Sequence, residues 1–157
     1  MPSSADMDND SDNNTLAANR EIMRRNIEEL FAKGDADLIE DLYWPNVVDH
    51  NPAPGQRQGH DGLRDVLAVF HSAFPDQQMQ LHGTLADGDL AVDFWTFRAT
   101  HTGEIEGWPA SGREVTFQGI DVARIVDGRI IEIWHVEDIA SMWTQLGRGL
   151  QASPSIP

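Results

Sequence analysis

The sequence contains no cysteine, which excludes disulfide bonds, a thiol nucleophile and a thiolate metal site. Basic residues are scarce: 11 Lys and Arg stand against 26 Asp and Glu, giving a formal net charge of −15. Because contacts to phosphate need Lys and Arg, this balance argues against binding to nucleic acid or to an anionic membrane. No apolar run approaches the roughly 20 residues that span a membrane, and the N-terminus lacks the basic and apolar regions of a signal peptide. We therefore expect a cytoplasmic protein that binds neither nucleic acid nor membrane.

The distribution of apolar residues divides the chain into one domain and two short tails. Residues 1–14 are mostly Ser, Asp and Asn, with almost nothing to bury, and are predicted to be a disordered acidic tail. Residues 15–147 carry regular apolar patterns and are long enough to form one domain with a sizeable core. Residues 148–157 are predicted to be a second disordered tail.

The period of the apolar pattern changes between residues 74 and 79. Before this point, helical periodicity covers 15–33, 37–43 and 60–73, with a short strand at 47–52. After it, alternation typical of strands covers 79–85, 90–102 and 115–138, and a short helix is expected at 139–146. Helices followed by a run of antiparallel strands is the order of α+β proteins. The predicted fold has N-terminal helices packed on a strongly curved antiparallel sheet of about four strands, which encloses a pocket.

Residues 115–138 give the clearest structural signal in the chain. Two runs rich in Val, Ile and aromatic residues flank an Asp-Gly dipeptide at 127–128, which is typical of β-hairpin turns. A two-residue loop would set Ile125 opposite Ile130. We prefer a three-residue loop that includes Val126, because it unites the apolar residues of both strands on one face. These residues are Phe117, Ile125, Ile131 and Ile133.

The preferred register also places Asp121 and His135 on that apolar face, on neighbouring strands. A charge on an otherwise apolar surface needs a partner, because its burial alone is costly. One interpretation is a structural Asp–His hydrogen bond inside the core. The other is a general acid/base pair that lines a pocket, with pKa values adjusted by burial. Periodicity alone leaves both interpretations open.

Several motifs make the chain similar to one known family. The stretch H-T-G-E-I-E-G-W-P-A-S-G-R-E-V-T-F-Q-G-I-D-V-A-R-I-V-D-G-R-I-I-E-I-W-H-V-E-D resembles the SnoaL-like polyketide cyclases, as do D-H-N-P-A-P-G-Q, G-H-D-G-L, F-H-S-A-F-P-D and the late Q-L-G. The resemblance extends over residues 18–147 and implies an NTF2-like cone, with helices and a curved antiparallel sheet around a deep pocket. It also implies sheet-to-sheet dimers. For the enzymes of the family it implies ring closure without a cofactor, by intramolecular aldol condensation with a carboxylate as acid/base.

The sequence departs from the cyclases at the acid/base position. The catalytic Asp that they carry on the last strand falls at His135, and a His on the preceding strand falls at Asp121. The two residue types are therefore exchanged between neighbouring strands. We expect His135 to be the base, and Asp121 to orient it and to stabilise the imidazolium that forms.

Six further residues are candidates for substrate binding: His50, Asn51, Trp95, Trp108, Phe117 and Asp138. The resemblance places His50 and Asn51 near the pocket, and the alternative is a loop-capping pair. The three aromatic residues would form walls on which a flat polycyclic substrate stacks. Asp138 either lines the mouth of the pocket or caps the helix that follows it. Because no histidines have metal-ligand spacing, no metal site is predicted.

Two classes of function fit these observations. The first is a cofactor-free enzyme of the cyclase or isomerase kind, which uses Asp121 and His135 on a small hydrophobic or polycyclic carbonyl compound. The second is a binding module whose cone holds a small apolar ligand without catalysis. An epoxide-opening hydrolase on the same fold is a further alternative. An apolar stripe on the outward side of the hairpin also predicts a homodimer, with Trp134 near the centre of the interface.

Overall fold

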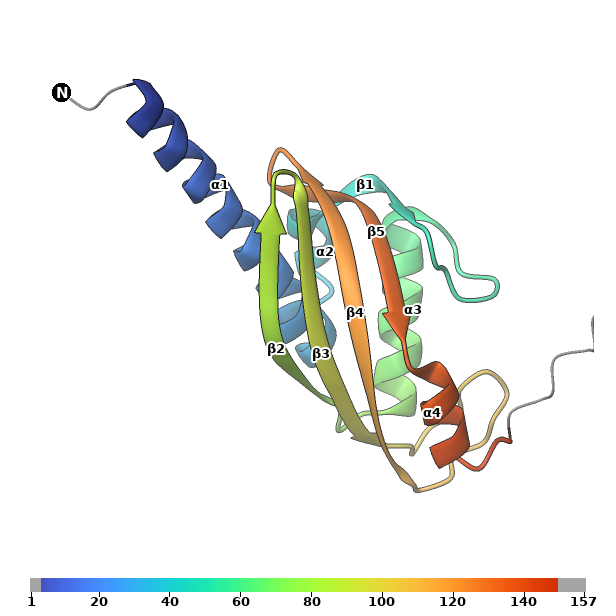
Figure 1. The fold of residues 1–157 in the computed structure, drawn as a ribbon. Helices are drawn as coiled ribbons and strands as arrows, with labels where there is room; N and C mark the ends of the chain where they lie inside the picture. Colours follow the sequence, from blue (N-terminus) through green and yellow to red (C-terminus); the bar gives the residue numbers. More distant parts are fainter. Residues whose placement is uncertain (1–3, 150–157) are drawn as a thin grey trace, which may run out of the picture.

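The computed structural model describes residues 4–149, with side chains from residue 12 onward. Its helices are α1 (Ser4–Arg25), the π-helix η1 (Asn26–Phe31), α2 (Leu38–Leu42), α3 (Gly59–Ala73) and α4 (Ile139–Gln145). Its strands are β1 (Tyr43–Asp49), β2 (Gln78–Asp87), β3 (Leu90–Thr100), β4 (Glu114–Val126) and β5 (Arg129–Glu137). The predicted α+β class is confirmed, and Figure 1 shows α2 and α3 behind the sheet. None of the helices in this part of the chain is long and apolar enough to cross a membrane.

The start of α1 differs from the sequence prediction. The sequence predicts disorder over residues 1–14, but α1 begins at Ser4 and takes in most of that segment. A helix that is already formed gains one hydrogen bond for each residue that it orders, so it can extend without an apolar face. In Figure 1 this part of α1 extends beyond the end of the sheet. Of the predicted tail at 148–157, residues 150–157 lie outside the described part of the chain.

The sheet has five strands in the order β1-β5-β4-β3-β2. β2, β3, β4 and β5 pair antiparallel with their neighbours, as predicted. β1 instead runs parallel to β5, so the sheet is mixed rather than wholly antiparallel, with one strand more than expected. The chain enters β1 directly from α2, where Tyr43 adopts extended backbone geometry. This pairing places Asp49, the last residue of β1, beside Ile133 of β5.

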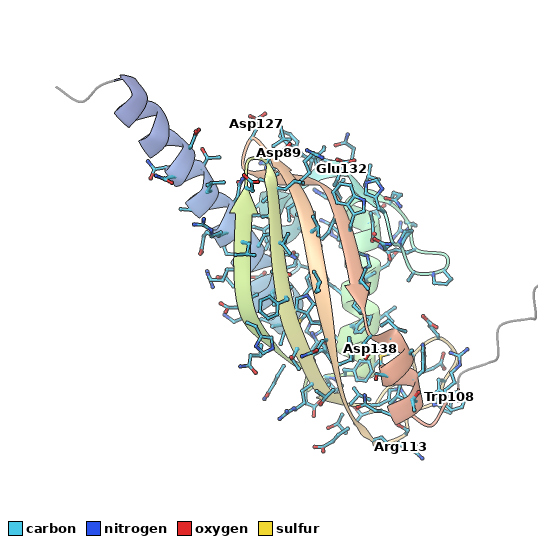
Figure 2. The ribbon with its side chains drawn as sticks, in the orientation of Figure 1. Asp89, Trp108, Arg113, Asp127, Glu132 and Asp138 are labelled. Atoms are coloured by element: carbon cyan, nitrogen blue, oxygen red, sulfur yellow. The ribbon has the colours of Figure 1, made fainter. Side chains whose placement is uncertain are left out.

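The turn between β4 and β5 corrects the predicted three-residue loop. Asp127 and Gly128 have φ angles of 48° and 74°, and Val126 pairs directly with Arg129. The loop therefore has two residues, and Figure 2 shows Asp127 at its tip. Positive φ at both central positions is a type I′ turn, whose twist matches that of the flanking strands. This match favours the shorter loop over the one that we preferred.

A β-bulge in β5 then changes the register of the hairpin. Ile125 pairs with Ile130 next to the turn, whereas Asp121 pairs with His135 further along, so Ile131 is the extra residue. Ile130 is fully buried and Ile131 only partly, the reverse of the expected arrangement. The bulge therefore restores the predicted placement of Asp121 and His135 on one face of the sheet despite the different loop, and it sets the two residues directly opposite each other.

Two apolar clusters fill the space between the sheet and the helices. The first joins α1, η1, α2 and α3 to the sheet and includes Met23, Leu30, Leu42, Tyr43 and Ile130. The second is rich in aromatic residues and includes Phe74, Trp95, Phe97, Phe117 and Met142. The rings of Phe97 and Phe117 stack with their centroids 4.7 Å apart. Full burial of each large apolar side chain contributes roughly 1.5–3 kcal/mol to folding, so these clusters hold the helices against the sheet.

The outer face of the sheet carries the apolar stripe that the sequence indicates: Ile120, Val122, Val126, Trp134 and Val136. Val136 is 71% exposed and Ile120 is 51% exposed, and Leu85 and Phe94 extend the apolar surface onto β2 and β3. α1 does not cover this stripe, because its buried Met23 packs with Ala91 and Ala123 of the opposite face. Trp134 is half-buried and stacks on His50, with centroids 4.4 Å apart.

We expect the protein to form a homodimer through this outer face, because a monomer rarely leaves so continuous an apolar surface in water. Val136→Glu should split the dimer, since it would bury an unpaired charge in the interface. Light scattering at micromolar concentration measures the mass of both forms. Ser72→Glu adds the same charge on the exposed side of α3 and should leave the dimer intact. A wild-type mass of 17.5 kDa would contradict the prediction.

Candidate active site

A cavity of about 490 Å³ lies between the two apolar clusters, and residues of both line it. Its apolar wall includes Ile27, Phe31, Leu63, Leu67, Phe70, Trp95, Phe97, Phe117, Ile133 and Met142. Its polar wall comes mainly from β1, β4, β5 and the loop after β1, and includes Tyr43, Asp49, Asn51, Asp121, His135 and Glu137. A cavity of this size and lining suits a small hydrophobic molecule that carries a few polar groups.

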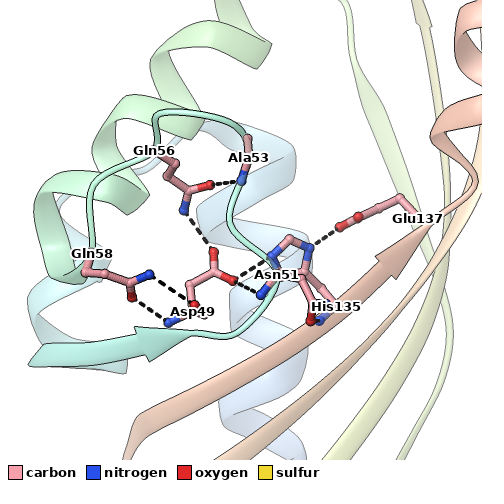
Figure 3. Close-up of polar contacts among 7 residues, drawn as sticks. All are labelled: Asp49, Asn51, Ala53, Gln56, Gln58, His135 and Glu137. Carbon is pink, nitrogen blue, oxygen red and sulfur yellow. Dashed lines mark hydrogen bonds and ion pairs between the residues drawn. The ribbon is translucent and has the colours of Figure 1, made fainter. Parts of the chain in front are cut away.

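His135 is held between two carboxylates (Figure 3). Its Nε2 lies 2.9 Å from Asp49 Oδ1, and its Nδ1 lies 2.7 Å from Glu137 Oε1. The backbone N–H of His135 also donates to Asn51 Oδ1 at 3.0 Å. Both ring nitrogens are therefore engaged by acceptors, which fixes the orientation of the imidazole.

The loop after β1 holds the Asp49 carboxylate in place, as Figure 3 shows. Gln56 Nε2 donates to Asp49 Oδ2 at 2.8 Å, and the backbone N–H of Asn51 donates to Oδ1 at 2.9 Å. The side chain of Gln58 bonds both the N–H and the carbonyl of Asp49. With His135 included, the carboxylate has three donors, so its position is fixed before any ligand binds.

The two carboxylates also determine the charge of His135. Burial alone lowers the pKa of His135, but the hydrogen bonds to Asp49 and Glu137 and the charges of these groups outweigh it and raise the pKa to about 10. Burial likewise raises the pKa of Asp49, but the hydrogen bond and charge of His135 reverse this effect and lower it. At neutral pH His135 is therefore an imidazolium that donates a hydrogen bond to each carboxylate.

Asp121 lies in a different environment on β4. It is buried, and its Oδ2 accepts a hydrogen bond from Trp95 Nε1 at 3.1 Å. Burial first, and then the charge of Glu137, raise the pKa of Asp121 to about 7. The neighbouring Gly119 makes room for the indole, since a Cβ there would lie 2.2 Å from Trp95 Cζ2. A carboxyl that titrates near neutrality in a cavity is suited to proton transfer.

The structure places Asp121 and His135 on the same cavity wall, opposite each other in the β4–β5 register. It does not give them the expected mutual hydrogen bond, because Asp49 and Glu137 occupy both ring nitrogens of His135. Alternation along β5 could have indicated Glu137, which follows His135 by two residues on the same face. The sequence carries no comparable signal for Asp49, whose position depends on the parallel pairing of β1 with β5.

His50 does not line the cavity. Its ring stacks on Trp134, and its Nε2 lies 3.2 Å from Glu132 Oε1 on the other side of the sheet from the site. Asn51 does line the cavity, as do Trp95 and Phe117. Because side chains alternate along a strand, Asp49 at the end of β1 points inward and the next residue points outward.

Trp108 and Asp138 are also outside the cavity wall. Trp108 bridges to Ile105 in the loop between β3 and β4, and Asp138 is the N-cap residue just before α4 (Figure 2). Asp138 Oδ1 accepts a hydrogen bond from the backbone N–H of Ser141 at 3.0 Å, so it caps the helix rather than lining the pocket mouth. The described residues contain no cluster of His, Asp and Glu able to hold a metal ion.

The fold and the cavity define an α+β cone of the NTF2-like type that encloses a small-molecule pocket. A solved structure of this type is TsrD from Streptomyces laurentii, which superposes with a TM-score of 0.76 at 28% sequence identity. The superposition covers 84% of this chain and 96% of TsrD.

The sequence comparisons identify the family. A model of the SnoaL-like polyketide cyclases matches residues 21–146. The chain is similar to the aklanonic acid methyl ester cyclase DauD of Streptomyces sp. (strain C5), with 24% identity over 133 residues, 81% of this chain and 80% of DauD. It is equally similar to the aklanonic acid methyl ester cyclase DnrD of Streptomyces peucetius, with 24% identity over 137 residues, 81% of this chain and 89% of DnrD. The chain belongs to the SnoaL-like polyketide cyclase family and is an enzyme of the cyclase type.

Proposed function

We propose that the protein is a cofactor-free cyclase that closes a ring in a hydrophobic, polyketide-like carbonyl compound by intramolecular aldol addition. The observation that carries the proposal is Asp121, a carboxyl whose pKa is raised to about 7 in an apolar cavity that also contains the cation of His135. The aromatic wall formed by Trp95, Phe97 and Phe117 offers flat surfaces to a polycyclic substrate. Two relatives are named as cyclases of aklanonic acid methyl ester, which agrees with ring closure in a carbonyl compound.

Asp121 is the acid/base of the proposed reaction. Its carboxylate removes a proton from the carbon next to a substrate carbonyl, and the C–H electron pair becomes the enolate. The enolate carbon attacks a second carbonyl of the same molecule and forms the new C–C bond. The resulting alkoxide takes the proton back from the Asp121 carboxyl. Atoms and electrons balance within one substrate molecule, so the step needs no co-reactant.

His135 is the cation of the site in this proposal rather than its base. As an imidazolium it has no lone pair with which to accept a proton. Its charge stabilises the enolate oxygen, and this interaction strengthens as negative charge develops there. The proposal therefore exchanges the roles expected from the sequence, in which His135 takes the proton and Asp121 orients it. A carboxylate remains the proton acceptor, as in the cyclases that the chain resembles.

The test is an assay with aklanonic acid methyl ester, the compound that appears in the names of the two relatives, and with simpler diketones that undergo aldol closure. Ring closure by aldol addition conserves mass, so liquid chromatography with mass spectrometry would detect an isomer of the substrate that forms only with the protein. Calorimetry in parallel measures binding. Tight binding of these compounds without any isomer would favour the binding module and contradict the proposal.

We expect kcat/KM to rise with pH through about 7, because only the ionised Asp121 can accept a proton. Glu137→Gln should move this acid limb to lower pH, since the charge of Glu137 is, after burial, the main cause that raises the pKa of Asp121. His50→Gln changes a residue on the outer face and should leave the limb in place. Profiles of kcat/KM against pH for wild type and the two variants check the prediction. An acid limb at the same pH in Glu137→Gln as in wild type would contradict it.

A further inference from the structure

The mechanism above leaves one buried acid without a role. Asp93 lies on β3, on the inner face of the sheet, and is fully buried. Neither of its carboxyl oxygens has a hydrogen-bond partner among the described residues. Buried carboxyl groups are normally hydrogen-bonded, because an unpaired one costs stability. A carboxyl in this state calls for a functional explanation.

Asp93 sits directly opposite Asp121. The two residues pair in the β3–β4 register and share the inner face of the sheet. Side chains at directly paired positions of antiparallel strands have Cβ atoms about 4.5–5.5 Å apart. Two carboxyl groups this close in a buried site cannot both carry a full charge, so one of them retains a proton.

The surroundings decide which of the two is ionised first. The indole N–H of Trp95 donates to Asp121, and the positive charge of His135 lowers the pKa of Asp121. Asp93 has no side-chain donor, and only the backbone of Asp121 lowers the pKa of Asp93. The nearby hydroxyl of Tyr43 already donates a hydrogen bond to Asn26 Oδ1 at 2.6 Å. Burial first, and then the charge of Asp121, raise the pKa of Asp93 to about 9. The proton therefore stays on Asp93.

The other titratable groups around the pair come from β1 and β5. Tyr43 and Asp49 are contributed by β1, and His135 and Glu137 by β5. The packed turn of η1 adds only the neutral amide of Asn26. Asp49, His135 and Glu137 are already joined by hydrogen bonds, and Tyr43 donates to Asn26. None of them is bonded to Asp93.

We propose that Asp93 is a positioning residue for the reaction: it is the buried half of a carboxyl pair in which Asp93 holds the proton and Asp121, the only half that lines the cavity, carries the charge. The inference rests on the proposed function for its catalytic meaning, but the pair itself does not depend on it. A neutral Asp93 keeps a second negative charge away from the enolate that forms beside Asp121. Ionisation of Asp93 would oppose that enolate and slow the reaction.

Carboxyl titration by NMR tests the pair directly. In protein labelled with ¹³C at the Asp carboxyl carbons, wild type should show two aspartates that titrate far above the ordinary value near 4. Asp93→Asn should remove the upper step and keep the lower one. Asp121→Asn should remove the lower step and move the remaining one down by about one pH unit or more, because the like charge is gone. The Nε1–H signal of Trp95 should follow the lower step.

The control for these spectra is Asp87→Asn, which makes the same change on an exposed carboxylate at the end of β2. It should retain both steps. Asp93→Asn is expected to fold, since neither oxygen of Asp93 takes part in a hydrogen bond that the change would break. The pair is disproved if Asp93 titrates with the ordinary aspartates, or if Asp121→Asn leaves the upper step in place.

The pH dependence of the reaction rate tests whether Asp93 affects catalysis. Wild type should lose activity as pH rises through about 9, where Asp93 ionises, whereas Asp93→Asn should keep its activity to about 10, where His135 loses its proton. A merely structural role would not move the alkaline limb. An unchanged limb would overturn the positioning role even if the NMR titration shows the pair. If no substrate is turned over at all, the proposed function fails, while the NMR result still decides whether the carboxyl pair exists.

Discussion

Asp121→Asn is expected to lower kcat about 10²–10⁴-fold, the usual contribution of a general acid/base. Asparagine has nearly the same shape and can still accept the hydrogen bond from Trp95 Nε1, but it can neither take a proton nor return one. KM should change little, because the lost interaction is made only on the way to the transition state. Steady-state kinetics of ring closure measures both quantities.

Stability measurements separate this effect from unfolding. The folded-state pKa of Asp121 is raised, so its contribution to the free energy of unfolding is present below the unfolded value near 3.8 and is lost as pH rises through about 7. Asp121→Asn removes this loss and should be more stable than wild type at pH 8 by a larger margin than at pH 4. Asp87→Asn should leave both kcat and stability unchanged. Full activity in a folded Asp121→Asn protein would rule out the acid/base assignment.

His135→Gln is expected to lower the free energy of unfolding by about 3 kcal/mol at pH 6, because it removes the cation from between Asp49 and Glu137. This value is the lower end of the usual cost of removing one partner from a buried ion pair, because the side chains of His135 and Glu137 remain 21% and 24% exposed. Glutamine can still donate one hydrogen bond but leaves two negative charges without compensation. Urea unfolding followed by circular dichroism measures the difference from wild type.

The loss of unfolding free energy in His135→Gln should depend on pH. The folded-state pKa of His135 is raised from 6.5 to about 10, so its stabilising contribution is fully present below 6.5 and is lost as pH rises through 10. The difference between wild type and His135→Gln should therefore shrink from pH 6 to pH 9. The matched variant His50→Gln breaks an exposed pair with Glu132 and should cost at most about 1 kcal/mol. Equal losses of unfolding free energy in the two variants would refute a stabilising role for the contacts of His135 with Asp49 and Glu137.

The elements that the sequence predicts best are those with strong local signals. The hairpin around residues 127–128 and the helix at 60–73 both occur, because turn chemistry and apolar periodicity are encoded within a few residues. The expected loop length is wrong, yet Asp121 and His135 still share one face of the sheet because the bulge at Ile131 offsets the shorter turn. A bulge of this kind has no clear local signature in the sequence. The prediction that these two residues share a face is therefore correct for a reason that the sequence pattern does not contain.

The part of the site that the sequence could not predict depends on contacts between distant segments. Asp49 and His135 are 86 residues apart along the chain. They meet only because β1 pairs in parallel with β5. Without that pairing, the sequence does not favour Asp49 over His50 or Asn51. In the structure Asp49 bonds the imidazole of His135, Asn51 accepts from its backbone N–H, and His50 lies on the other side of the sheet. Asp93 illustrates the same limit, since only the β3–β4 register shows that it faces Asp121.

The bulge at Ile131 has one more consequence, for the way this fold can change by insertion and deletion. Side chains of a strand alternate between its two faces, so the extra residue sets the phase of everything from Glu132 to the end of β5. Loss of Ile131 alone would invert that phase, turning Trp134 and Val136 toward the cavity and His135 toward solvent. A single codon deletion, without altering any residue that lines the pocket, would thus exchange the polar wall of the site for the apolar surface of the sheet.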